Sequence, residues 1–256
     1  MADAYFAYSN INPFNISDMN DLTPFQKQYY TTTTEIGRKP SKRFLQIVND
    51  NDIHPTAIIG NNVRIGKGNK IGAYVVIQGK TFIGNNNVFE PFCSIGNEPE
   101  HKEFFGKKNK GTNIGNNNVF REYVTVNAGC YVPTQLGDNI TMLRGSHVGH
   151  DCEINDGCTI SCNVLIGGHS LLGKGVNMGL GSICHEYSKI GSYAMIGMGA
   201  IVTKKINPNC FGVYVGNPAK YIKENYYIKQ EWSYEMVLDI CAEFDKMVDS
   251  YDENLI

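Results

Sequence analysis

Residues 146–162, SHVGHDCEINDGCTISC, contain two histidines and three cysteines, side chains that can bind metals or move protons. Imidazole and thiolate groups are common zinc ligands in proteins. A histidine can instead take a proton from an attacking hydroxyl or amine near neutral pH. The segment therefore predicts either a metal site or an acid–base centre, and the choice depends on how the fold presents these side chains.

A period of six residues runs through most of the chain. Large apolar residues occupy every sixth position from Ile53 to Ile95, from Ile114 to Val132 and, after a short slip, from Leu136 to Val202. The position two residues earlier is usually small, and glycine often follows the large residue. This period fits neither an amphipathic helix nor a hairpin strand. It predicts an all-β, hexapeptide-repeat parallel β-helix in which three hexads form each coil of 18 residues.

The period also divides the chain. We expect the β-helix over residues 51–218, an N-terminal cap over 1–50 and a helical segment over 219–256. The phase is lost at 97–112, which predicts a segment looped out of the coil, and long loops on rigid scaffolds usually carry function. The C-terminal helix is expected to cap the open end of the solenoid through its apolar face. That face consists of Met236, Ile240, Phe244 and Met247.

Composition limits the classes of function. The formal net charge is −2 and the pI is about 6.3, which argue against a nucleic-acid partner held by bulk charge. No apolar run approaches the roughly 18 residues of a membrane span, so no membrane insertion is expected. Residues 1–12 lack the features of an export signal. With eight cysteines that we expect to be reduced, the sequence favours a cytoplasmic protein.

The hexad phase accounts for most of the cysteines without a metal. A buried free cysteine behaves as a small apolar residue, and neither a CxxC pair nor zinc-ribbon spacing is present. We therefore predict structural cysteines and no metal ligand among them. The small position of the hexad holds Cys93, Cys130, Cys152 and Cys158, and the large inward position holds Cys184.

Four of the six histidines lie between residues 147 and 185, outside both inward-facing positions. His169 follows His150 by one coil plus one residue, and His185 follows it by two coils less one. We therefore expect these three side chains to line up on the outer surface, with His147 beside His150. Such a line suits acid–base catalysis or a zinc site. In γ-class carbonic anhydrases, however, the close ligand pair is five residues apart, whereas His147 and His150 are three apart.

Three blocks, HVGHDCEI, IGGHSLLG and SICHEYSKIG, carry a family resemblance, as does the stretch SIGNEPEHKEFFGKKNKGTNIGNNNVFREYVTVNAG. They resemble the UDP-N-acetylglucosamine O-acyltransferases of lipid A synthesis and related N-acyltransferases of nucleotide-linked amino sugars. The resemblance covers roughly residues 53–217. It implies a left-handed β-helix and a homotrimer with active sites between subunits. Because no cysteine or serine is placed as a nucleophile, we expect direct acyl transfer in a ternary complex.

The resemblance also implies residue roles. His150 matches the general base, and Gly168 matches the backbone N–H that stabilises the oxyanion. Asp151 follows the base and is expected to tune it, although alternation of adjacent side chains argues against direct contact. The predicted substrate-binding residues are His147, His169, His185, Glu186, Asn127, Glu100, His101 and Lys102. Asn217 matches a residue near the nucleotide or acyl chain. Apart from the resemblance, the charges of Lys204, Lys205 and Lys220 predict contacts with the phosphates of a coenzyme A donor.

Departures from the family shape the functional hypothesis. Asn127 replaces a family histidine, Glu186 replaces a glutamine, and the end GVYVGNPAKYIK resembles acetyl-CoA-dependent sugar acetyltransferases. We therefore expect transfer of an acetyl or short acyl group from acyl-CoA to the amine of a nucleotide-linked amino sugar. The first alternative is O-acylation of a UDP-amino sugar by an acyl carrier protein. A zinc hydratase and a non-catalytic trimeric scaffold remain as alternatives from other classes.

Overall fold

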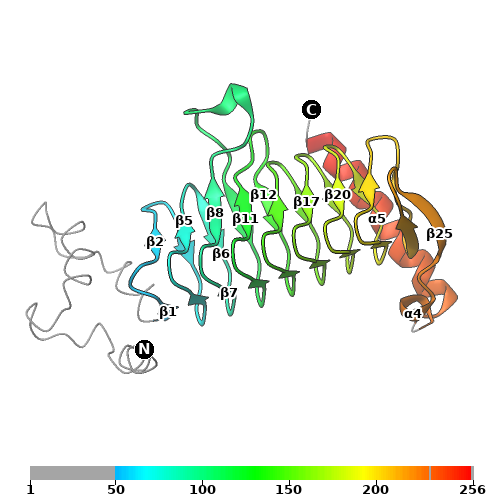
Figure 1. The fold of residues 1–256 in the computed structure, drawn as a ribbon, viewed down its shortest axis with the longest axis horizontal. Coiled ribbons are helices and arrows are strands. Elements are labelled where there is room, and N and C mark those ends of the chain that lie inside the picture. The colour runs from blue at the N-terminus through cyan, green and yellow to red at the C-terminus, as the bar shows by residue number, and fades with distance from the viewer. Residues whose placement is uncertain (1–49, 231, 255–256) are drawn as a thin grey trace, which may run out of the picture.

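The computed structural model describes residues 50–254 apart from residue 231, and over this range the chain is a triangular solenoid of short parallel strands (Figure 1). The predicted cap at 1–50 lies outside the described residues except for its last position. Three sheets form the three walls, which we call sheets A, B and C. The predicted β-helix is confirmed.

Sheet A has ten strands, sheet B has eight and sheet C has seven. The strands of sheet A are β1 (Asp52–Ile53), β4 (Lys70–Ile71), β7 (Val88–Phe89), β10 (Val119–Phe120), β13 (Thr141–Met142), β16 (Thr159–Ile160), β19 (Asn177–Met178), β22 (Met195–Ile196), β24 (Gly212–Val215) and β25 (Lys220–Glu224). Those of sheet B are β2 (Ile58–Ile59), β5 (Val76–Ile77), β8 (Ser94–Asn97), β11 (Thr125–Asn127), β14 (His147–Val148), β17 (Leu165–Ile166), β20 (Ile183–Cys184) and β23 (Ile201–Val202). Those of sheet C are β3 (Arg64–Ile65), β6 (Thr81–Ile83), β9 (Thr112–Ile114), β12 (Thr134–Leu136), β15 (Glu153–Ile154), β18 (Leu171–Leu172) and β21 (Lys189–Ile190).

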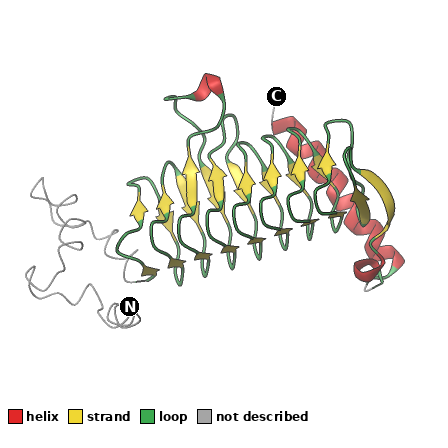
Figure 2. Ribbon diagram, in the orientation of Figure 1, coloured by secondary structure: helices red, strands yellow, loops and turns green. Residues whose placement is uncertain are grey.

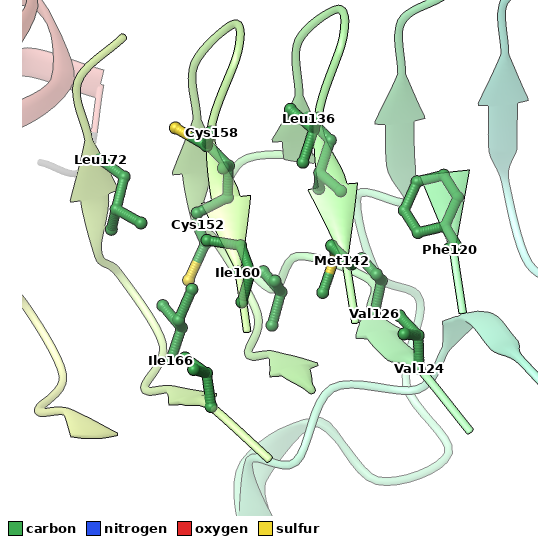
Figure 3. Packing of buried hydrophobic residues seen from close by; sticks show 14 of the residues in the cluster. Phe120, Val124, Val126, Leu136, Met142, Cys152, Cys158, Ile160, Ile166 and Leu172 are labelled. Atoms are coloured by element: carbon green, nitrogen blue, oxygen red, sulfur yellow. The ribbon is translucent and has the colours of Figure 1, made fainter. Parts of the chain in front are cut away.

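The large residue of each hexad points into the solenoid. Ile77, Phe120 and Ile166 are fully buried, and Figure 3 shows the side chains of Cys152 and Cys158 within the same row of buried residues. All eight cysteines are free, and burial raises the pKa of the Cys158 thiol to about 12. The five cysteines of the hexad positions are all buried, in agreement with their interpretation as small apolar residues of the wall.

Strand register repeats every 18 residues, except at two insertions. Leu171 pairs with Lys189, 18 positions on, but Ser94 pairs with Thr125, 31 positions on, because the looped-out segment lies between them. Figure 1 shows this segment projecting from the wall beside β8, and it contains the short helix η2 (Lys102–Phe104). Thr112 pairs with Thr134, 22 positions on, so four more residues are inserted near residues 129–132. The flanking strands still pair in parallel beyond each insertion, although the pairing of β11 with β8 shifts by one residue between Val126 and Asn127.

The C-terminal segment differs from the prediction of a helix from residue 219. Gly216 adopts φ +92°, and the chain reverses so that β25 pairs antiparallel with β24 at the edge of sheet A. Tyr221 and Ile222 suit a strand better than a helix. Two helices follow, α4 (Tyr226–Lys229) and α5 (Tyr234–Asn254), and no helix within the described range is long and apolar enough to cross a membrane. Figure 2 confines helical structure in the described range to the looped-out segment and this C-terminal region.

The sequence predicted that the C-terminal helix would cap the open end of the solenoid, but helix α5 does not. It packs on the outer face of sheet C and runs back alongside the later coils (Figure 1). Leu171, the outward residue of β18, is fully buried beneath Phe244 and Tyr251. Of the predicted apolar face, Phe244 is buried but Met236 is exposed, because the face that contacts the wall includes Phe244 and Tyr251.

A ladder of buried asparagines supports the first coils at the corner between sheets C and A. The side-chain oxygen of Asn69 accepts from the backbone N–H of Asn87 at 2.9 Å, and that of Asn87 accepts from Asn118 N–H at 2.9 Å. The amide of Asn87 also donates to the carbonyl of Gly115 at 3.0 Å. Because Asn87 is fully buried, no water can replace these bonds.

Asn87→Ala should therefore lower the free energy of unfolding by at least about 2 kcal/mol, since each buried group left unpaired costs roughly 1–3 kcal/mol. Asn85→Ala is the matched control because Asn85 accepts a comparable bond from Lys67 N–H while exposed to solvent. We expect a loss below about 1 kcal/mol for this control. Urea unfolding of both variants measures the difference. Equal losses would show that burial of the ladder adds nothing.

Candidate active site

The polar site lies at the corner between sheets B and C, where three successive coils place a side chain in the left-handed backbone region. Asp151, His169 and Tyr187 have φ values of +58°, +56° and +62°, at intervals of 18 residues. At such a position the chain turns sharply and the side chain leaves the strand alternation. The corner therefore aligns these three residues in one column.

The carboxylate of Asp151 is fully buried and accepts hydrogen bonds from the inserted residues. Its Oδ1 accepts from the N–H groups of Tyr131 and Val132 at 2.7 and 2.8 Å, and its Oδ2 accepts from Cys130 N–H at 3.0 Å. Burial raises the pKa of Asp151, but the bonds from His150 and the three N–H groups outweigh burial and lower it. Asp151 therefore stays ionised at neutral pH.

His150 contacts Asp151 directly, which corrects the prediction that adjacent residues would diverge. The Nδ1 atom of His150 lies 2.7 Å from Oδ2 of Asp151, and the imidazole is only 5% exposed. The contact exists because the left-handed backbone at Asp151 breaks the alternation on which the prediction rested. The carboxylate orients the ring with Nδ1 as donor, so that Nε2 is left as the acceptor.

Gly168 lies against the other edge of the His150 ring. A Cβ added at Gly168 would lie 2.8 Å from both Cε1 and Nε2 of His150, so only glycine fits here. The backbone N–H of Gly168 makes no hydrogen bond within the described part of the chain, whereas the neighbouring Gly167 and His169 N–H groups bond to Cys184 and His150 carbonyls. A free N–H beside the base is suited to receive negative charge from a ligand.

His169 joins His150, but His185 does not. The rings of His150 and His169 lie edge to face at 5.0 Å between centroids, and His169 is 5% exposed. Tyr187, not His185, lies one coil above His169 and stacks on it at 4.5 Å. His185 is exposed, and its Nδ1 lies 3.0 Å from the carbonyl oxygen of Glu186. The predicted line of histidines is therefore wrong for His185, and the prediction that all four reach the outer surface is wrong for the two buried ones.

The looped-out segment closes over this corner. His101 packs edge to face on His150 at 5.5 Å, and Phe104 packs on Tyr131 at 5.2 Å. Glu100 Oε2 lies 3.8 Å from Nε2 of His147. The predicted segment thus brings Glu100 and His101 to the site, whereas Lys102 is exposed and joins no described contact of the cluster.

His147 lies on the outer face of sheet B, one residue before the inward Val148 of β14. Its Nδ1 is 2.7 Å from Oγ1 of Thr125 in the preceding coil. Burial lowers the pKa of His147, although Glu100 partly offsets this effect. A largely neutral imidazole at this position can accept or donate a single hydrogen bond to a bound hydroxyl.

The remaining predicted residues fall into two groups. Asn127 is buried with a side-chain N–H₂ that has no hydrogen-bond partner within the described residues, and Lys204 Nζ lies 5.1 Å from the ring centroid of Tyr187. The unpaired amide of Asn127 and the ammonium group of Lys204 beside Tyr187 are therefore each able to contact a ligand. The others are exposed and have no described contact with the histidine cluster beyond the charge of Glu186, which acts on His169. They are Glu186, Asn217, Lys205 and Lys220.

One group of described side chains has the spacing of metal ligands: Cys130, His150 and Asp151. The Asp151 oxygens already accept three backbone N–H groups and contact His150. Burial, with the charge of Asp151, raises the pKa of the Cys130 thiol to about 12, so the thiolate that binds zinc is disfavoured. We therefore interpret the group as an acid–base pair with a neutral thiol beside it.

Sequence reasoning missed the aromatic residues of the site. Tyr131 and Tyr187 contact His169, Phe104 packs on Tyr131, and none of the three belongs to a predicted role. Two signals were available. Tyr187 follows His169 by one coil length, and Tyr131 lies in the slip of the hexad phase that precedes Leu136.

The chain was compared with protein families and with known proteins. No family model matches it. The acyl-(acyl-carrier-protein)–UDP-N-acetylglucosamine O-acyltransferase of Stenotrophomonas maltophilia is 36% identical over 177 residues, which span 61% of this chain and 67% of the relative. The protein of the same name from Xylella fastidiosa is 37% identical over 183 residues, with the same coverage of each chain.

Solved structures give the same result. The UDP-N-acetylglucosamine O-acyltransferase (LpxA) of Moraxella catarrhalis superposes with a TM-score of 0.58 at 28% identity, over 74% of this chain and 82% of that one. LpxA from Acinetobacter baumannii gives a TM-score of 0.61 at 28% identity, over 75% and 80% of the two chains. These matches agree with the left-handed β-helix that the sequence resemblance implied.

Burial of His169 generates a prediction about the pH dependence of stability. Burial lowers the pKa of His169, and Asp151 only partly offsets it. Below the ordinary histidine pKa of about 6.5, the unfolded chain binds a proton that the folded chain does not. The free energy of unfolding therefore decreases as the pH is lowered. His169→Asn should make this fall shallower between about pH 7 and about pH 5, since asparagine tolerates the left-handed backbone and does not titrate. Urea unfolding across this range measures it, and an identical fall in both proteins would contradict the prediction.

Proposed function

The chain belongs to the family of UDP-N-acetylglucosamine O-acyltransferases, and from that premise we propose that it transfers an acyl group from an acyl carrier protein to a hydroxyl of a UDP-linked amino sugar. The observation that carries the proposal is the His150–Asp151 pair facing the backbone of Gly168. This arrangement provides a base, a carboxylate that orients the base, and a free backbone N–H. These are the groups that direct acyl transfer requires.

In the proposed reaction, Nε2 of His150 accepts the proton of the sugar hydroxyl as its oxygen attacks the thioester carbonyl. Asp151 stabilises the imidazolium that forms. The N–H of Gly168 donates to the oxyanion of the tetrahedral intermediate. Collapse of the intermediate breaks the carbon–sulfur bond, and the imidazolium returns the proton to the thiolate. The products are the sugar ester and the free thiol of the carrier.

The surrounding side chains fit the recognition of a sugar. His147 and His169 supply polar atoms near the base, and the Asn127 N–H₂ and Nδ1 of His169 have no hydrogen-bond partner within the described residues. We propose that these groups contact the hydroxyl and amide groups of the acceptor. Glu100 and His101 complete the site from the looped-out segment, because they already contact His147 and His150.

The expectation of acyl-CoA as donor and an amine as acceptor is not supported. The relatives that identify the family carry names that specify an acyl carrier protein and an O-acyl transfer. The alternative stated from the sequence is therefore the better hypothesis. Lys204 remains a proposed contact for the donor because it reaches Tyr187 beside the site. Three further residues remain predicted to contact the donor, but none of them has a described contact with the base. They are Asn217, Lys205 and Lys220.

We also propose a homotrimer with the site between subunits, acting in the cytoplasm. An apolar stripe on the outer face of sheet B supports the trimer. Leu165 and Ile183 pair in register directly above His147, and they are 46% and 36% exposed in the single chain. A second copy against this stripe would bury it and would bring a neighbouring surface to His147.

His150→Ala should lower kcat by about 10² to 10⁴, the usual contribution of a general base. Gly168→Ala should also abolish most activity, because its Cβ would overlap the His150 ring. The assay follows release of carrier-protein thiol with a panel of acyl lengths and UDP-amino sugars. Acyl-CoA with the same acceptors is the parallel assay. Turnover with acyl-CoA and not with acyl carrier protein would overturn the proposed donor.

Ile183→Asp should convert a trimer of the 28.5 kDa chain into monomers, since it places a charge within the apolar stripe. Met236→Asp is the control, because Met236 is equally an exposed apolar residue but lies on α5. Sedimentation velocity gives the mass of each protein. A monomeric wild type would contradict the proposed assembly.

A further inference from the structure

Helix α5 is fixed to the wall of the solenoid at several points. Phe244 and Tyr251, two turns apart on one face of the helix, bury Leu171 of β18, and Met247 and Val248 pack against the same cluster. Lys174 Nζ lies 2.6 Å from Oε1 of Glu243. Together these contacts direct the last turns of the helix along sheet C toward the corner that carries the site.

Tyr251 is the residue of α5 that reaches this corner. Its hydroxyl donates a hydrogen bond to the backbone carbonyl of Asp151, and the side chain is only 5% exposed. Burial raises the pKa of the Tyr251 phenol, so the hydroxyl stays protonated and acts as the donor. The contact therefore joins two segments that are 100 residues apart in the sequence.

The carbonyl of Asp151 is an unusual acceptor in this solenoid. The ladder between coils uses the carbonyl of the preceding residue, since His169 N–H donates to His150 O at 2.9 Å. Within the described residues, no backbone N–H donates to Asp151 O. Tyr251 thus supplies the hydrogen bond that the repeat itself does not provide at this left-handed residue.

With this bond, every polar group of Asp151 is held. Thr134 Oγ1 accepts from its N–H at 2.9 Å, the inserted residues bind its carboxylate, and Tyr251 binds its carbonyl. Since the carboxylate sets the orientation of His150, any rotation of the Asp151 peptide would move the base. We propose that Tyr251 is a positioning residue that holds the His150–Asp151 pair in the geometry for proton transfer. This inference rests on the proposed acyl transfer.

Tyr251→Phe tests the inference because it removes only the hydroxyl and keeps the ring against Leu171. We expect kcat to fall about tenfold, which corresponds to about 1.4 kcal/mol in the activation barrier, with the KM of both substrates unchanged. Asp252→Asn is the matched control. It removes the adjacent ion pair with Lys189 and leaves the bond to Asp151 in place, so its kcat should equal that of the wild type.

A second readout does not depend on turnover. The Nδ1–H proton of His150, bound to the carboxylate, should give a downfield ¹H NMR signal in ¹⁵N-histidine-labelled protein, assigned by its loss in His150→Gln. Tyr251→Phe should shift this signal, and Asp252→Asn should not. Thermal unfolding of each variant confirms that it is folded.

The outcomes separate the two proposals. A wild-type enzyme that turns over, with unchanged kcat and an unmoved signal in Tyr251→Phe, overturns the positioning role and leaves the function intact. A wild type that is inactive with every donor and acceptor, but whose signal shifts in Tyr251→Phe, overturns the function and supports the structural link. An inactive wild type with an unmoved signal overturns both.

Discussion

The buried carboxylate of Asp151 is the interaction on which the site depends. Three backbone N–H groups stabilise its charge, and this stabilisation allows a carboxylate without solvent contact to remain ionised beside an imidazole. A buried charge of this kind needs most of its hydrogen-bonding capacity filled by the protein. The inserted residues 130–132 fill it from one side, and the corner backbone supplies His150 from the other. The arrangement of the residues around the site therefore follows from the need to stabilise the buried charge of Asp151.

Much of the fold follows directly from the period of six. The inward row, the three-strand coils and the structural role of Cys152 and Cys158 were predictable because each depends on local spacing alone. The position of helix α5 could not be predicted from the period. Its contact with the wall depends on Leu171, an outward residue whose burial no repeat can indicate, since the repeat describes only the inward side. The strand β25 was missed for a related reason, because pairing with the edge of sheet A is a tertiary choice.

The site shows the same division. Motif resemblance assigned roles to His150, Gly168 and His169, and the structure brings these three residues together at one corner. Counting coils from one histidine to the next failed for His185, because a shift of one residue at a corner changes which side chain enters the column. The contact of His150 with Asp151 could not be derived from strand alternation, which does not hold where φ is positive. Backbone conformation at single residues, rather than period, decides these details.

The two insertions have a consequence for how such proteins diverge. Both leave the solenoid near the corner between sheets B and C, and the strands pair again beyond each insertion, with a one-residue shift between Val126 and Asn127 beside the looped-out segment. One insertion binds the carboxylate and the other covers the base. A solenoid of this kind can therefore gain, lose or exchange segments that carry functional residues without repacking its core. During divergence, the wall can stay unchanged while the segments at the corner are replaced.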